Sequence, residues 1–270
     1  MIYPIYDNTQ CELTDLRVLI TRPATQANTL IQMLNEAHAI PRLLPMVAIH
    51  SRFDDPSLTL ALNAYDAAEY LIFTSVNAVT HAIMAIKQAK KQWPPSKIIF
   101  AVGSTTRDCL QDQGCTEVII PDGKFCSENL LHKIASYPIR DKLMIIFGGA
   151  HPRSLLESTL KKQNAQVLHA ICYERHQEVI KMDLTQQHEL LDSIDVFVFT
   201  SDEILVCFMQ IICDELHDQL FKKPFLIISR RMHQTLQRMG YTKSPIIADN
   251  PTDSGIMAAL THWYEEYHHG

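Results

Sequence analysis

Serine, threonine and asparagine side chains gather at turns where apolar segments pass into helical patterns. The first turn of a helix has unpaired backbone N–H groups, and the helix dipole favours negative charge there, so carboxylates can bind at such turns. The alternative is that Ser75, Ser104, Ser127 and Ser201 are ordinary N-caps. Gly103 opens one of the turns and would let a ligand approach the backbone. The candidate binding residues are Thr74, Ser75, Asn77, Gly103, Ser104, Ser127, Thr200 and Ser201.

Three arginines are candidates for bidentate carboxylate binding, because the planar guanidinium matches the two carboxylate oxygens. They are Arg22, which follows the apolar run Val18-Leu-Ile20, and Arg153 and Arg175 in the middle of the chain. The alternative for each is a solvated arginine on the surface.

Several other kinds of chemistry are excluded or disfavoured. The chain has only 8 glycines and no G-x-G, so it lacks the turns of a dinucleotide fingerprint or a phosphate loop. It has no H-E-x-x-H, no G-x-S-x-G and no metal-spaced Cys/His set, and its 13 histidines are scattered. We expect no metal site.

The composition is that of a globular protein: 270 residues, 47% hydrophobic, with a net charge of −6. Interspersed charge of this kind argues against general binding to nucleic acid or to membranes. The 7 cysteines form no C-x-x-C, which is typical of buried thiols in a reducing compartment. Without a signal peptide or a membrane-length apolar run, we expect a cytoplasmic location.

Apolar runs alternate with amphipathic stretches, which predicts βαβ units and mostly parallel sheets, an α/β fold. The same order then recurs at a constant offset of 126 residues: Thr74-Ser75 as Thr200-Ser201, Leu110 and Gly114 as Leu236 and Gly240. We infer two similar halves from an internal duplication. The sequence alone leaves open whether the halves are sequential or exchange their first strand and helix.

The ordered set of short motifs resembles the uroporphyrinogen-III synthase family, over about residues 17–265. The motifs are Val18-Leu-Ile-Thr-Arg-Pro23, Phe73-Thr-Ser-Val-Asn-Ala-Val79, Val102-Gly-Ser-Thr-Thr106, Ser127-Glu-Asn-Leu130, Tyr173-Glu-Arg175, Phe199-Thr-Ser201 and Asp249-Asn-Pro-Thr252. The chain departs from the family pattern at Ser229-Arg-Arg-Met232, where a hydroxyl is missing, and at Phe147, which stands in place of an arginine.

The resemblance implies two flavodoxin-like parallel-sheet domains, joined by two extended crossing strands, with a cleft between them. The implied domains are residues 1–46 with 178–270, and residues 47–177. It also implies cyclisation of the linear tetrapyrrole hydroxymethylbilane to uroporphyrinogen III in haem biosynthesis, with loss of water and inversion of ring D through a spiro intermediate. The implied enzyme is a cofactor-free lyase, which we expect to be a monomer with a small-molecule substrate.

Within that reaction Tyr173 is the candidate to assist departure of the substrate hydroxyl by donating a hydrogen bond. Thr106 would orient a carboxylate or a pyrrole N–H, and Thr252 belongs to the binding set by its motif. The alternatives are a packed tyrosine and a threonine bonded to its own backbone. A different class of function, a two-lobed module that binds a small anion without chemistry, also fits repeated lobes with serine-rich strand ends.

Overall fold

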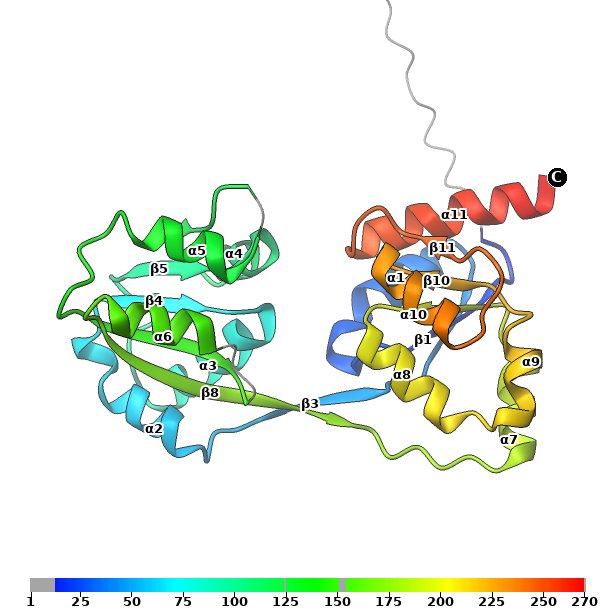
Figure 1. Ribbon diagram of the computed structural model, residues 1–270, viewed down its shortest axis with the longest axis horizontal. Helices are drawn as coiled ribbons and strands as arrows, with labels where there is room; N and C mark the ends of the chain where they lie inside the picture. The colour runs from blue at the N-terminus through cyan, green and yellow to red at the C-terminus, as the bar shows by residue number, and fades with distance from the viewer. Residues whose placement is uncertain (1–12, 124, 151–153, 270) are drawn as a thin grey trace, which may run out of the picture. The chain divides into compact units, whose positions relative to one another are not determined.

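The computed structural model describes residues 13–123, 125–150 and 154–269, and they divide into two compact units. Unit 1 contains the described residues up to Ala48 and those from His176 onward, and unit 2 contains Ile49–Arg175. The predicted boundaries, after residues 46 and 177, each lie two residues from these. In Figure 1 the blue N-terminal elements therefore share a unit with the yellow to red C-terminal ones.

Unit 2 is built on a six-stranded sheet of order β3-β8-β7-β4-β5-β6. Strand β4 pairs with β5 and β7, β5 pairs with β6, and β7 pairs with β8, all in parallel. The strands are β3 (Val47–Ser51), β4 (Tyr70–Phe73), β5 (Ile98–Ala101), β6 (Val118–Ile119), β7 (Leu143–Gly149) and β8 (Gln166–Gln177).

Helices cover both faces of this sheet, because alternate strand residues point to opposite sides. Leu71 and Phe73 pack with α2, α3 and α4, whereas Tyr70 and Ile72 pack with α5 and α6. The helices are α2 (Pro56–Asn63), η2 (Tyr65–Ala67), α3 (Val76–Gln88), α4 (Ser104–Asp112), α5 (Ser127–Ile134) and α6 (Ser154–Lys162).

Unit 1 has a five-stranded sheet of order β11-β10-β9-β1-β2, with parallel pairings throughout. The helices α1 and α11 cover one face, and α8 and α10 cover the other. The strands are β1 (Arg17–Ile20), β2 (Ile40–Leu43), β9 (Val196–Phe199), β10 (Phe225–Ile227) and β11 (Ile246–Ile247). The helices are η1 (Ala24–Gln26), α1 (Asn28–Glu36), α7 (Leu184–Asp192), α8 (Asp202–Ile211), η3 (Asp214–Leu216), α9 (His217–Leu220), α10 (Arg230–Arg238) and α11 (Asp253–His269).

The predicted duplication is visible in the order of the strands. Strand β9 has the same position in the unit 1 sheet as β4 has in the unit 2 sheet, and its residue numbers are 126 higher. The residue numbers of α10 are likewise 126 higher than those of α4. Strand β1, the first of the N-terminal half, pairs with β9 of the C-terminal half. Strand β7, the first of the C-terminal half, pairs with β4 of the N-terminal half, so each half contributes its first strand to the other half's sheet. The exchanged arrangement is the one adopted. Gly114 and Gly240 end equivalent helices with φ of 93° and 96°, a conformation that glycine adopts without strain.

An ion pair secures the exchanged strand at the amino edge of the unit 1 sheet. Arg17 begins β1, and its Nη2 and Nε donate to the Asp195 carboxylate at 2.5 and 2.8 Å. The Arg17 backbone N–H donates to the same group at 2.9 Å. These hydrogen bonds, the guanidinium's above all, hold the pKa of Asp195 below its ordinary value of 3.8.

We expect Asp195→Asn to lower the free energy of unfolding at pH 7 by about 1 kcal/mol, since the pair is partly exposed and screened. The stabilisation is present above the ordinary carboxyl pKa and is lost as the pH falls through the lowered one, so the two proteins should converge below about pH 4. Urea unfolding at pH 7, 5 and 3 measures this difference. A difference that is constant across this range would contradict the assignment.

Among the described residues, no helix is both long and apolar enough to cross a membrane.

Candidate functional site

The carboxyl edge of the unit 2 sheet brings together several of the predicted residues. Ser75 caps α3 by accepting a hydrogen bond from the Ala78 N–H at 3.1 Å. Thr74 Oγ1 donates to the carbonyl of Phe147, at the end of the neighbouring strand β7, at 3.1 Å. Asn77 lies buried in the first turn of α3. The N-cap interpretation of Ser75 is thus confirmed, and its hydroxyl is shared with a further partner described below.

The N-cap interpretation is wrong for Ser104 and Ser127. Each is the first helical residue, and the caps are Gly103 and Cys126, neither of which makes a side-chain cap hydrogen bond among the described residues. The first turns of α4 and α5 therefore lack the side-chain oxygen that would normally occupy their N–H groups. Thr106 is buried in the first turn of α4.

Tyr173 lies on β8 next to a β-bulge. Gly148 pairs with Ile171 but Gly149 pairs with Tyr173, which leaves Cys172 as the extra residue of β8. A regular strand would place Cys172 and Tyr173 on opposite faces, whereas both belong to the core beneath α3. The bulge therefore turns Tyr173 toward the start of α3, a re-aiming that bulges often provide beside functional sites.

The Tyr173 hydroxyl lies 3.1 Å from Ser75 Oγ, and the residue is 7% exposed. Its ring stacks on the His81 ring, with centroids 5.7 Å apart. The ring also packs closely against Gly149 of β7. A Cβ atom added at Gly149 would lie only 3.0 Å from Tyr173 Cζ. A residue larger than glycine at position 149 would push on this ring.

The sequence does not indicate a role for His81, because the histidines are scattered along the chain. It lies on α3, half-buried, with its Nδ1 2.8 Å from Ser51 Oγ. Burial lowers the pKa of His81 below its ordinary value of 6.5, so the ring is neutral at pH 7. A single histidine in a helical pattern gives no signal of a stacking partner on a distant strand.

Cys172, the bulged residue, is not a candidate nucleophile. Its thiol donates to the Ala170 carbonyl at 3.4 Å, and burial raises its pKa to about 12. The described residues contain no group of three or more His, Cys, Asp or Glu able to hold a metal ion.

In unit 1, Arg22 follows β1 at the carboxyl edge and is only 8% exposed, so the surface interpretation is wrong for this arginine. Its Nη1 contacts Asp253 Oδ1 at 2.5 Å and the Gln26 carbonyl at 3.1 Å. Its Nε and Nη2 are buried and have no hydrogen-bond partner in the described part of the chain. Buried charged donors without acceptors are costly, so the Nε–Nη2 edge of this guanidinium is a candidate position for an anion.

The other unit 1 candidates lie at the same carboxyl edge or at a helix start. Ser201 caps α8 through the Ile204 N–H at 3.2 Å, which confirms its N-cap interpretation, and Thr200 precedes it. Thr252 Oγ1 contacts Asn250 and accepts from the Gly255 N–H at 3.1 Å, just before and within the first turn of α11. Of the remaining arginines, Arg175 is exposed on β8 and Arg153 lies outside the described residues.

Comparison with known proteins places this architecture in a family. A family model described as uroporphyrinogen-III synthase HemD matches residues 28–258. The chain belongs to the uroporphyrinogen-III synthase family. The family match favours the enzyme over the binding-module alternative.

Individual relatives agree with the family assignment. The uroporphyrinogen-III synthase of Salmonella typhimurium is 23% identical over 91% of this chain and 100% of its own length. That of Proteus mirabilis is 28% identical over 59% of this chain and 80% of its own length. A crystal structure of uroporphyrinogen III synthase from Thermus thermophilus shares the fold, with a TM-score of 0.57 at 16% identity over 93% of this chain and 99% of that one.

Proposed function

We propose that this member of the uroporphyrinogen-III synthase family cyclises hydroxymethylbilane to uroporphyrinogen III. The pyrrole nitrogen lone pair expels the hydroxyl and leaves an electrophilic azafulvene. The substituted carbon of ring D attacks the azafulvene and gives a spiro intermediate. The original bond from this carbon to the bridge of ring C then breaks, and the unsubstituted carbon of ring D bonds to that bridge, which leaves ring D inverted. Loss of a ring proton completes the release of water. The enzyme's main contribution is to hold a flexible chain in the reactive geometry, so the proposal invokes no cofactor.

The observation that carries the proposal is the Tyr173 hydroxyl at the start of α3, in a chain of this family. Ser75 Oγ accepts from the Ala78 N–H, so its own proton can go to Tyr173 Oη. Tyr173 then keeps its O–H for the leaving hydroxyl of the substrate. This chain of donors stabilises negative charge on the departing oxygen. Thr106, in the first turn of α4, is proposed to orient a pyrrole N–H or a carboxylate.

The substrate's carboxylates are proposed to bind at the carboxyl edges of the sheets. Arg22 supports this most directly, because its buried Nε and Nη2 have the spacing of a bidentate carboxylate site. The helix starts without side-chain caps at Gly103 and Cys126 offer backbone N–H groups to further carboxylates. The rest of the proposed binding set is Thr74, Ser75, Asn77, Ser104, Ser127, Arg153, Arg175, Thr200, Ser201 and Thr252.

An isomer assay tests the proposed function. We expect the purified protein, given freshly made hydroxymethylbilane, to yield the type III isomer faster than spontaneous closure yields type I. The products are oxidised and separated by chromatography. Type I alone, at the rate of a protein-free control, would overturn the proposal, and unchanged substrate held on the protein would favour the binding module.

We further propose that the enzyme acts in the cytoplasm as a monomer. The six described cysteines are all free, as expected in a reducing compartment. Size-exclusion chromatography with light scattering tests the oligomeric state, and a mass near 30.8 kDa is expected.

A further inference from the structure

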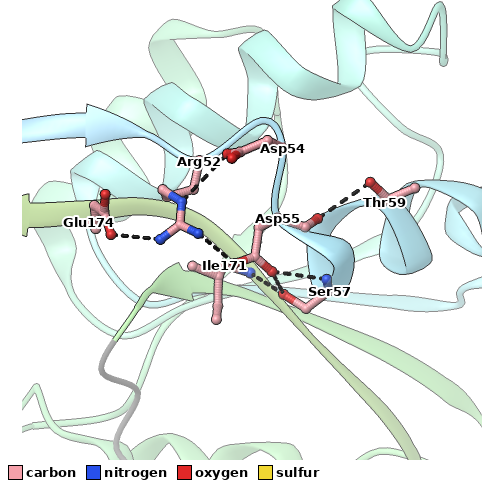
Figure 2. Close-up of polar contacts among 7 residues, drawn as sticks. All are labelled: Arg52, Asp54, Asp55, Ser57, Thr59, Ile171 and Glu174. Atoms are coloured by element: carbon pink, nitrogen blue, oxygen red, sulfur yellow. Dashed lines mark hydrogen bonds and ion pairs between the residues drawn. The ribbon is translucent and has the colours of Figure 1, made fainter.

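Arg52 lies at the junction where β3 ends and makes contacts on both sides of Tyr173. Its backbone N–H donates to the Cys172 carbonyl at 2.9 Å. Its Nη1 donates to the Glu174 carboxylate at 2.6 Å. Figure 2 shows the guanidinium between Glu174 of β8 and the two aspartates that precede α2. Arg52 thus holds the residue before Tyr173 by its backbone and the residue after it by its side chain.

The first turn of α2 adds another contact to the same part of β8. Ser57 Oγ accepts a hydrogen bond from the Ile171 N–H at 3.1 Å and donates to Asp55 Oδ1 at 2.6 Å. Asp55 caps α2 through the Ser57 N–H and lies 3.6 Å from Arg52 Nη2. In Figure 2 these residues form one continuous network along β8.

The network meets β8 where the bulge occurs. Ile171 is the last residue in regular register and Cys172 is the extra one, and both are bonded to this network. From the other side, the Ala150 N–H donates to the Tyr173 carbonyl at 3.0 Å. The bulge is therefore fixed from both sides, and the bulge is what turns Tyr173 toward Ser75.

The charges argue against a direct role for Arg52 in binding the substrate. Three carboxylates, Asp54, Asp55 and Glu174, lie within 4 Å of its guanidinium. Its positive charge is thereby compensated, and a further carboxylate would meet like charges. This distinguishes Arg52 from Arg22, which has, within the described part of the chain, one carboxylate partner and two unpaired nitrogens.

We propose that Arg52, with Asp55 and Ser57, is a positioning residue that fixes the β8 bulge and thereby the place of the Tyr173 hydroxyl. The inference rests on the proposed function for its kinetic consequence, but the position of Tyr173 can be measured without any turnover.

The first test observes Tyr173 directly. The protein is labelled with 3-fluorotyrosine, and the Tyr173 signal is identified as the ¹⁹F resonance missing from Tyr173→Phe. We expect Arg52→Met to shift or broaden this resonance and Arg52→Lys to restore part of it. The control is Arg17→Met, which removes an arginine–aspartate pair of unit 1 and should leave the resonance in place. An unchanged Tyr173 resonance in folded Arg52→Met would overturn the inference, whatever the activity.

The second test is a double-mutant cycle on turnover. We expect Arg52→Met to lower kcat about tenfold with KM within about twofold, and to have less than a twofold effect when Tyr173 is already phenylalanine. Equal fold losses in both backgrounds would overturn the inference. If Arg52→Met does not fold, Ser57→Ala replaces it in both tests with the same expectations. If the wild type makes no type III product, the proposed function fails while the ¹⁹F result still decides the inference.

Discussion

Replacing Tyr173 by phenylalanine is expected to lower kcat for cyclisation about 100-fold while KM changes little. The hydroxyl is the only group removed, and a positioned donor to a leaving oxygen typically contributes 10² or more to the rate. The melting temperature should fall by about 4 °C or less, since one neutral hydrogen bond of about 1 kcal/mol is lost and Ser75 keeps its bond from the Ala78 N–H. Steady-state kinetics and calorimetry measure the two effects.

Tyr65→Phe is the matched control for this substitution. Tyr65 is also buried in unit 2 and also has one hydrogen bond from its hydroxyl, to the Gln92 carbonyl at 3.2 Å. It should lose similar stability and keep full activity. Normal kcat in Tyr173→Phe together with a large loss of stability would show that Tyr173 is only a packing residue.

Replacing Arg22 by methionine is expected to raise KM for hydroxymethylbilane about 10- to 100-fold, with kcat within a few-fold of wild type. A charge-assisted hydrogen bond is worth about 1.5–3 kcal/mol, and the buried Nε and Nη2 are proposed to make such bonds only when a carboxylate is bound. Because Arg22→Met leaves Asp253 without its partner, the double variant Arg22→Met/Asp253→Asn is the cleaner protein.

The double variant should be at least as stable as wild type in urea, because it removes two buried donors that have no acceptor among the described residues. Weaker substrate binding without lost stability is the signature of a group kept for its ligand. The Arg17→Met/Asp195→Asn variant, which removes an ion pair at the opposite edge of the same sheet, should lose stability and keep its KM. An unchanged KM in the Arg22 double variant would contradict the carboxylate site.

The repeated elements could be predicted from the sequence because local patterns define them. The helices α4 and α10 have apolar residues at helical spacing and a glycine after the last turn, so their place in the duplication was readable from Leu110, Gly114, Leu236 and Gly240. The carboxyl-edge residues followed from the same logic, because polar residues after buried strands of a parallel sheet gather at one edge.

Long-range contacts account for what the sequence could not predict. The bulge at Cys172 depends on Arg52 and Ser57, which lie more than a hundred residues earlier in the sequence. No local sequence pattern in β8 predicts it. His81 is recognisable as a neighbour of Tyr173 only once α3 and β8 are placed together. The caps of α4 and α5 were placed one residue late because a serine at the helix start is a stronger sequence signal than Gly103 or Cys126.

The exchange of first strands has a consequence for how the chain folds as it is made. Arg17 and Asp195, which join β1 to β9, are 178 residues apart, and closing a flexible loop of that length costs about 4–5 kcal/mol of entropy. Unit 2, however, is one continuous segment whose first and last strands, β3 and β8, are neighbours in its sheet. Once unit 2 has folded, its two ends are held close together. Its residues then no longer add to the length of the flexible loop between β1 and β9. Strand β1 and helix α1 can join their sheet only after β9 has been synthesised. Unit 2, which is synthesised between them, reduces the length of flexible chain that must close when β1 pairs with β9.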